Sequence, residues 1–118
     1  MEIVRLVDRP NFGVNIDPTN FRLVYGEDHL EAARRLAPHV KHCHLKDLLI
    51  ADSPQDDYEW GETPDGKWYR RAVMGEGNTQ PEEVIRILHQ AGYDGVISLE
   101  MPGPADVFDG VKRGVSNL

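Results

Sequence analysis

Three residues of types that bind metal ions each end a short apolar segment. Asp17, His44 and Glu100 each follow a few residues that include Val, Ile or Leu, a composition typical of β-strands. If the three segments are parallel strands, these side chains meet at one edge of the sheet. Carboxylate and imidazole ligands together suit a divalent ion such as Mn²⁺, Co²⁺, Zn²⁺ or Mg²⁺. The set has no thiolate, which excludes a structural cysteine-type zinc site.

Strand periodicity predicts further polar residues beside these three. The residues two positions before them are Asn15, His42 and Ser98. Because side chains two positions apart share one face of a strand, each pair is predicted to point inward. Taken singly, each candidate has a plain alternative: a turn or capping aspartate, a buried histidine with a partner, or a glutamate in an ion pair. Their equivalent positions in three successive strands favour the functional interpretation.

Other residues are candidates for contacting a substrate. Lys46 is predicted to point into the mouth of the site and neutralise a substrate oxyanion or phosphate; the alternative is a solvated lysine at the rim. His42 lies one pleat deeper and is predicted to orient a ligand by hydrogen bonding. Gly75 and Gly77 let the backbone approach a ligand closely, although a plain turn explains them equally well. Asp47 is predicted to cap the next segment or to pair with Lys46.

The pattern of apolar residues predicts the elements that position these side chains. Strands are predicted at 12–17, 40–45 and 96–101, and helices at 27–37, 81–91 and 105–117, with the end of another helix at 1–7. Alternating strands and helices with short connections predict an α/β fold with a parallel sheet. Each strand has an apolar outward face and a mixed polar inward face, which is typical of a barrel wall.

Capping and turn residues predict where the helices begin and end. The segment 17–20 is predicted to be a loop that contains Pro18. Pro38 is predicted to end the helix at 27–37. Thr79 and Glu82 are three residues apart, which predicts a capping box at the start of the helix at 81–91. Gly92 is predicted to follow the end of that helix.

The long segment between the second strand and the next helix is unusual. It holds four large aromatic residues: Tyr58, Trp60, Trp68 and Tyr69. The turn-forming sequence Pro64-Asp65-Gly66 predicts a small hairpin between 58–60 and 67–69. We interpret residues 48–78, approximately, as an inserted aromatic loop that is a lid or an oligomer contact. A solvated insertion is the alternative, since long surface insertions cost little free energy.

Composition excludes several classes of protein. With 118 residues and 40% hydrophobic residues, the chain is one domain or part of one. A net charge of −7 argues against nucleic-acid partners, because such binding depends on Lys and Arg. One cysteine, Cys43, rules out an internal disulfide. The sequence has neither a secretory signal nor an apolar run that spans a bilayer, so we expect no membrane association and a cytoplasmic location.

Four stretches match a known pattern in order. They are Gly13–Asn20, Val40–Asp47, Met74–Gly77 and Ala91–Glu100. Together they resemble the sugar phosphate isomerase/epimerase group of the xylose-isomerase-like TIM-barrel superfamily. The resemblance covers most of the chain and is specific for the superfamily, but it says little about the substrate.

The resemblance implies a (β/α)₈ barrel in which the three predicted strands are the last three. Members of the family bind a divalent metal through a glutamate, an aspartate, a histidine and a second glutamate. Asp17, His44 and Glu100 match the last three ligands, and the first glutamate has no counterpart. Asn20 stands where many relatives carry a substrate-binding histidine. The implied reaction on a sugar or sugar phosphate is metal-assisted removal of the proton α to a carbonyl, through an enediolate, with Glu100 as acid and base.

The length of the chain leaves alternatives open. A complete barrel of this type needs about 250 residues, so we expect this chain to be its C-terminal portion. Open strand edges invite pairing, which predicts a homo-oligomer or pairing with a missing half-barrel. A truncated, non-catalytic module for assembly or interaction is the main alternative function. A nuclease related to AP endonucleases is disfavoured by the acidic charge and the small number of His ligands.

Overall fold

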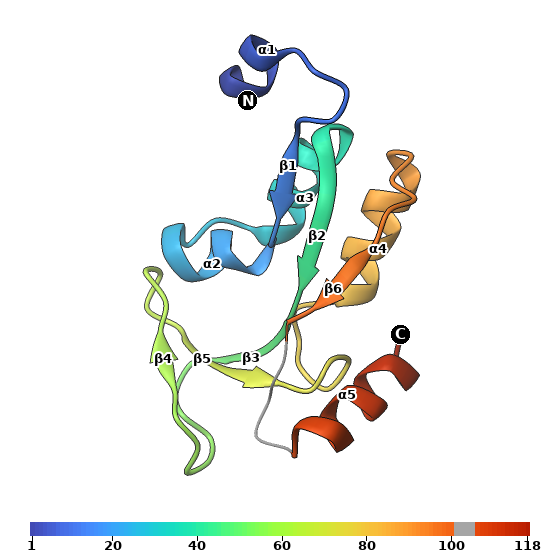
Figure 1. Cartoon of the computed structure of the whole chain (residues 1–118). Coiled ribbons are helices and arrows are strands. Elements are labelled where there is room, and N and C mark those ends of the chain that lie inside the picture. Colours follow the sequence, from blue (N-terminus) through green and yellow to red (C-terminus); the bar gives the residue numbers. More distant parts are fainter. Residues whose placement is uncertain (101–105) are drawn as a thin grey trace.

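The computed structural model describes residues 1–100 and 106–118 and contains two small sheets with helices around them (Figure 1). The helices are α1 (Glu2–Val7), α2 (Thr19–Tyr25), α3 (His29–Leu36), a 3₁₀ turn η1 (Ala37–His39), α4 (Pro81–Gln90) and α5 (Val107–Ser116). The strands are β1 (Val14–Ile16), β2 (Val40–Leu45), β3 (Asp47–Ala51), β4 (Gly61–Glu62), β5 (Trp68–Ala72) and β6 (Ile97–Leu99). No helix in the described ranges is long and apolar enough to cross a membrane.

The first sheet confirms the predicted parallel strands. Its order is β1-β2-β6, and both neighbouring pairs are parallel. Pairing aligns Ile16 with Cys43, and His44 with Ser98. The described residues form this open three-stranded sheet without closing a barrel, which is consistent with part of a (β/α)₈ barrel. The last residue of the predicted strand at 96–101 and the first residue of the predicted helix at 105–117 lie outside the described ranges.

Helices α3 and α4 cover one face of this sheet (Figure 1). The core between them and the sheet contains Ile16, Cys43, Leu45, Ala33, Leu36, Val84 and Leu88. Cys43 and Leu45 are buried while His42 and His44 are only partly so, as the predicted alternation along β2 requires. Burial raises the pKa of the Cys43 thiol to about 12, with a further contribution from nearby Asp17. Cys43 is therefore an unreactive core residue.

The predictions for the ends of α3 and α4 are confirmed in part. Asp28 caps α3 by accepting hydrogen bonds from the N–H groups of Leu30 and Glu31, both at 2.9 Å. The α-helix ends just before Pro38, as predicted, and Gly92 follows α4 with φ of +86°. The predicted capping box at Thr79 is wrong. The N-cap is Gln80, with no side-chain hydrogen bond.

Helix α2 begins at Thr19, within the loop predicted at 17–20. Pro18 is its N-cap, and the Thr19 hydroxyl donates to Asp17 Oδ1 at 2.9 Å. The helix has only seven residues, including Phe21 and Tyr25, whose rings lie 6.3 Å apart. So short a helix depends on tertiary packing more than on intrinsic propensity, which is why the periodicity of the sequence did not predict it.

The segment between β2 and α4 forms the second sheet, an antiparallel one in the order β3-β5-β4. The predicted turn is present, since the N–H of Gly66 donates to the Thr63 carbonyl at 2.9 Å. The predicted first strand is displaced, because β4 is 61–62 and not 58–60. Tyr58 and Trp60 instead flank the Arg70 guanidinium, at 5.3 and 5.6 Å from the ring centroids, an arrangement typical of cation–π contacts.

Asp47, the first residue of β3, joins this sheet to the loop before α4. The residue is 2% exposed, and its carboxylate accepts hydrogen bonds from the N–H groups of Gly75 and Gly77, at 2.9 and 2.8 Å. It also accepts from the N–H of Leu48 and from both the hydroxyl and the N–H of Thr79. The Thr79 side chain thus donates a hydrogen bond to Asp47 and does not cap α4 as predicted. A buried carboxylate with this many donors is a strong local anchor.

Replacing Asp47 by Ala should lower the free energy of unfolding by at least about 3 kcal/mol, because several buried donors lose their acceptor. The measurement is urea unfolding followed by circular dichroism. Asp57→Ala, at an exposed position, is the control and should change stability by less than about 0.5 kcal/mol. If Asp47→Ala does not fold, Asp47→Asn should give an intermediate loss, since one acceptor oxygen remains. Equal effects at positions 47 and 57 would contradict this account of the loop.

Candidate functional site

A three-residue ionic cluster lies where the strands of the parallel sheet end. The Lys46 ammonium donates to Asp17 Oδ2 at 2.6 Å and to Glu100 Oε2 at 2.7 Å. Each residue follows the end of a different strand: Asp17 follows β1, Lys46 follows β2 and Glu100 follows β6. Parallel strands bring their carboxyl ends to one edge, which is the edge where α/β proteins bind ligands.

Contacts of both side chain and backbone hold the three residues in place. Asp17 stands at the start of α2 and accepts a second hydrogen bond from Thr19. The N–H of Glu100 donates to the Leu45 carbonyl at 2.8 Å, which extends the pairing of β2 with β6 by one residue. Lys46 lies between Leu45, in this pairing, and Asp47, the anchor of the second sheet. The backbone on both sides of Lys46 is therefore fixed.

The members of the cluster differ in their access to solvent. The side chains of Lys46 and Asp17 are 11% and 12% exposed, whereas that of Glu100 is 42% exposed. Asp17 and Lys46 thus form a desolvated pair, and Glu100 is the carboxylate that a molecule arriving from solvent would meet. Two carboxylates and one ammonium leave the cluster with one excess negative charge.

Mutual contacts shift the pKa values of the cluster. Burial lowers the pKa of Lys46, but the hydrogen bonds to Asp17 and Glu100 outweigh it, so the pKa lies above the ordinary lysine value. The hydrogen bond from Lys46 lowers the pKa of Glu100, and burial opposes this effect. Both groups are therefore charged at neutral pH.

The two strand histidines, His42 and His44, share one face of β2. The ring of His42 contacts that of His44 edge-on, with centroids 5.2 Å apart. His42 Nε2 is 3.0 Å from the Ser98 hydroxyl on β6. His44 is close enough to Glu100 to help lower the pKa of that carboxyl. The predicted pairing of positions 42 and 44 on one face is thus present.

Comparison with protein families decides what kind of domain carries this site. Residues 1–117 match the family model described as xylose isomerase-like TIM barrel. The chain belongs to this family. Comparisons with curated proteins and with solved structures gave no match. The superfamily assigned from the sequence motifs is confirmed, and the β1-β2-β6 sheet is interpreted as part of a xylose isomerase-like barrel wall.

Other predicted substrate contacts do not converge on the cluster in this xylose isomerase-like domain. Gly75 and Gly77 do allow a close backbone approach, but the group that they approach is the Asp47 carboxylate. A Cβ atom on Gly77 would clash with that carboxylate and with the Leu48 carbonyl. Asn20 is exposed in the first turn of α2. Substrate contacts by these three residues remain predictions.

The predicted metal ligands can be tested against this geometry. Two carboxylates and an imidazole are suitable donors for a divalent metal. Within residues 1–100 and 106–118, however, no three His, Cys, Asp or Glu side chains converge on one point. The cation that lies between the two carboxylates is the Lys46 ammonium. As arranged here, the residues do not fit a divalent metal.

Lys46 was predicted to point into the mouth of the site, but its pairing with two candidate ligands was not predicted.

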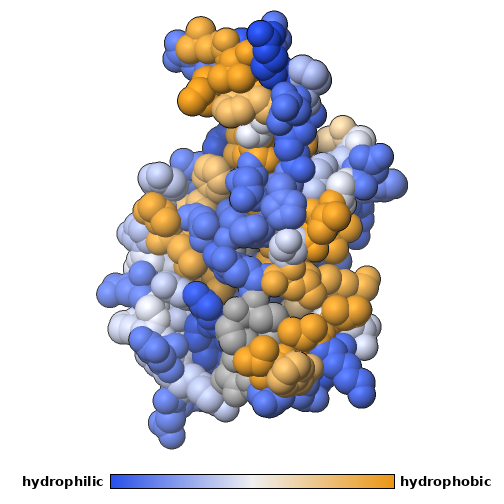
Figure 2. Space-filling view, viewed as in Figure 1, coloured by the Kyte–Doolittle hydropathy of each residue, from blue (hydrophilic) through white to orange (hydrophobic). Residues whose placement is uncertain are grey.

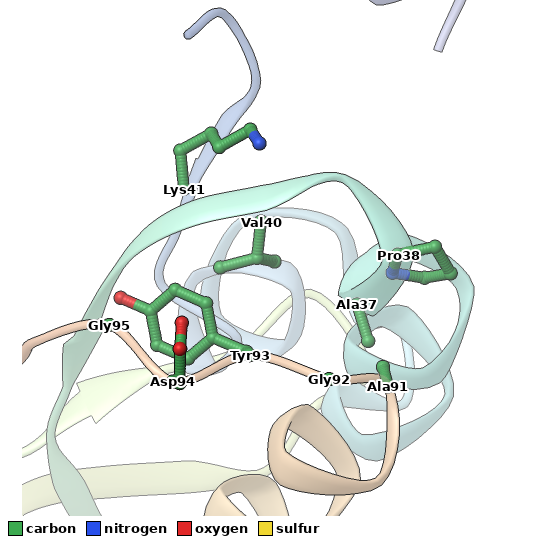
Figure 3. Close-up of a pocket in the computed structure, with 9 residues that line it drawn as sticks. All are labelled: Ala37, Pro38, Val40, Lys41, Ala91, Gly92, Tyr93, Asp94 and Gly95. Carbon is green, nitrogen blue, oxygen red and sulfur yellow. The ribbon is translucent and has the colours of Figure 1, made fainter. Parts of the chain in front are cut away.

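A cavity of about 260 Å³ lies at the opposite end of β2 (Figure 3). It is bounded by Val40 and Lys41 at the start of that strand and by the turn after α4, including Tyr93 and Asp94. The Tyr93 hydroxyl donates to the Val96 carbonyl at 2.6 Å, so the phenol already has a partner in the protein. This cavity is separate from the ionic cluster, because Lys46 follows the other end of the strand.

Proposed function

We propose that this domain isomerises a sugar or sugar phosphate by moving a proton between carbons next to a carbonyl group. The observation that carries the proposal is Glu100, an accessible carboxylate beside a buried ammonium at the ligand-binding edge of a xylose isomerase-like sheet. Membership of the family supports the class of reaction.

The chemistry assigns different tasks to the two carboxylates. Glu100 removes the proton from the carbon α to the carbonyl, which leaves an enediolate, and returns that proton to the neighbouring carbon, while the proton of the α hydroxyl passes to the former carbonyl oxygen. Because Lys46 keeps the pKa of Glu100 low, Glu100 is ionised but weakly basic. Proton removal therefore requires that positive charge stabilise the enediolate oxygen, and the Lys46 ammonium is the nearest source. Asp17, which is largely buried, holds Lys46 in position.

The presence of one exposed base, Glu100, favours one type of proton transfer over another. A carboxylate on one side of the substrate can return a proton only to the face from which it took it. This arrangement favours interconversion of an aldose and a ketose, whereas inversion at one carbon calls for a second acid on the other face. We therefore place isomerisation ahead of epimerisation for the residues that the structure describes.

Deuterium exchange tests this function across many sugars at once. The protein is incubated in D₂O with a panel of aldoses, ketoses and their phosphates, and loss of C–H signals is followed by NMR. At least one compound should exchange, and Glu100→Gln should slow the exchange by at least about 10²-fold. Glu82→Gln, on the exposed side of α4, should leave the rate unchanged. If no compound exchanges, or if Glu100→Gln exchanges at the wild-type rate, the proposal is wrong.

A second candidate function, assembly with other chains, has an observation of its own. Helix α1 has no buried residue and stands apart from the sheets. Helix α5 buries Gly110 and Gly114 but exposes Val107, Val115 and Phe108, the last at 87%. Figure 2 shows apolar surface at both places. Among the described residues, strands β1 and β6 each have one neighbour, so their outer edges can accept another strand. We propose that the chain pairs with a second copy or with other strands of a barrel.

Analytical ultracentrifugation tests the assembly proposal. The wild-type chain should sediment as a dimer or larger species at micromolar concentration, because apolar helix faces are then removed from water. Phe108→Glu should shift the equilibrium towards monomer, while Lys112→Glu in the same helix should not. A wild-type chain that remains monomeric throughout this range would contradict the proposal.

A further inference from the structure

The antiparallel sheet extends from the ionic cluster to helix α2, and its far end is attached to that helix by an ion pair. We propose that this far end, residues 52–70 with the turn between β4 and β5, is a flap over the cluster, and that Arg22 and Asp65 form its latch. Opening the latch uncovers the largely buried Asp17 and Lys46. The proposal concerns access to the cluster, so it does not depend on the reaction proposed above.

The base of the antiparallel sheet is fixed to the rest of the domain. Asp47, which directly follows Lys46, anchors the start of β3 to the loop before α4. Further along β3, the Asn78 side chain accepts a hydrogen bond from the N–H of Ile50 and donates one to its carbonyl, both at 2.9 Å. Movement of the sheet is therefore confined to the residues beyond this base.

The sheet borders the cluster on both sides. On one side, the charge of Arg71 on β5 adds to the hydrogen bond from Lys46 in lowering the pKa of Glu100, so β5 lies near this carboxylate. On the other side, the turn between β4 and β5 lies beside α2, the helix that follows Asp17 (Figure 1). Flaps in such positions control access to a site by opening and closing.

One ion pair joins the turn of the flap to α2. The Arg22 guanidinium donates to Asp65 Oδ2 at 2.7 Å, and the two side chains are 24% and 35% exposed. An added Cβ atom on Gly26, at the end of α2, would lie 3.6 Å from Asp65, so the helix end and the turn are close. Among the described elements, the principal contacts of β3, β4 and β5 are with one another. The flap is therefore held to α2 mainly at this point.

The latch can open at modest cost. The hydrogen bond from Thr63 lowers the pKa of the Asp65 carboxyl, burial opposes this effect, and the charge of Arg22 adds to it, so the pair is charged at neutral pH. Ion pairs that are partly exposed contribute little net stability. Arg22 Nε is also buried without a hydrogen-bond partner among the described residues. Water would satisfy this donor when the latch opens, which offsets part of the lost interaction.

Contacts within the flap allow it to move as a unit. The Asp56 carboxylate accepts a hydrogen bond from Trp60 Nε1 at 2.9 Å and forms an ion pair with Arg70. The rings of Tyr58 and Trp60 flank the same guanidinium. All four residues belong to the flap, so these contacts persist when the latch opens.

Spin labels can measure the position of the flap. The labels are attached to Glu62→Cys in β4 and Glu82→Cys in α4, both exposed positions, and the buried Cys43 needs no replacement. Pulsed electron paramagnetic resonance should give one narrow distance distribution with the latch intact, and Arg22→Gln should broaden and shift it. Arg35→Gln, which removes another exposed ion pair of a helix, is the matched control and should leave the distribution unchanged.

Acetylation then tests whether the flap covers the cluster. In the Arg22→Gln protein, Lys46 should react with acetic anhydride at least about threefold faster than in the wild type. Mass spectrometry reads the reaction, and the exposed Lys41 is the internal standard. Asp65→Asn removes the same ion pair from the other side, so it should reproduce both results, and it replaces Arg22→Gln if that variant does not fold. An unchanged distance distribution would overturn the proposal, and so would a broadened distribution without faster acetylation of Lys46.

Discussion

Two carboxylates at the end of one sheet require a positive charge between them, and the rest of the site follows from the way this charge is supplied. Asp17 and Glu100 come from strands on opposite sides of β2, so they would repel each other without a cation. Lys46, which follows β2, lies between them at hydrogen-bond distance from both. The same contacts orient Glu100 and lower the pKa of its carboxyl.

Local patterns in the sequence were sufficient to predict the elements that carry this site. The inward face of β2 follows from residue spacing alone, because burial of Cys43 and Leu45 leaves His42 and His44 on the other side. Helices α3 and α4 were predicted from their apolar stripes, which pack on the sheet. Elements that depend on distant partners were missed. Helix α2 is too short to be predicted by periodicity, and β3 is defined by its pairing with β5.

The candidate site was also predicted only where local patterns in the sequence determine it. Alternation in the strands brings Asp17 and Glu100 to one edge, but spacing does not show which group neutralises them. The prediction for Gly75 and Gly77 shows the same limit. A close backbone approach was one of two interpretations, and the partner of Gly77, Asp47, lies 30 residues away in the sequence. Local spacing predicted that Thr79 caps a helix, but its hydroxyl donates to the buried Asp47 carboxylate instead. Buried polar groups are nearly always hydrogen-bonded, and this requirement depends on the fold.

The most direct test of this account is a double-mutant cycle between Asp17 and Lys46 in metal-free buffer, with Asp17→Asn and Lys46→Met measured singly and together by urea unfolding. Because both side chains are largely buried, the coupling energy should exceed about 1 kcal/mol. The exposed pair of Glu31 and Arg34 is the reference and should give about 0.5 kcal/mol or less. A coupling between Asp17 and Lys46 no larger than that of the reference pair would show that Lys46 does not hold the carboxylates together.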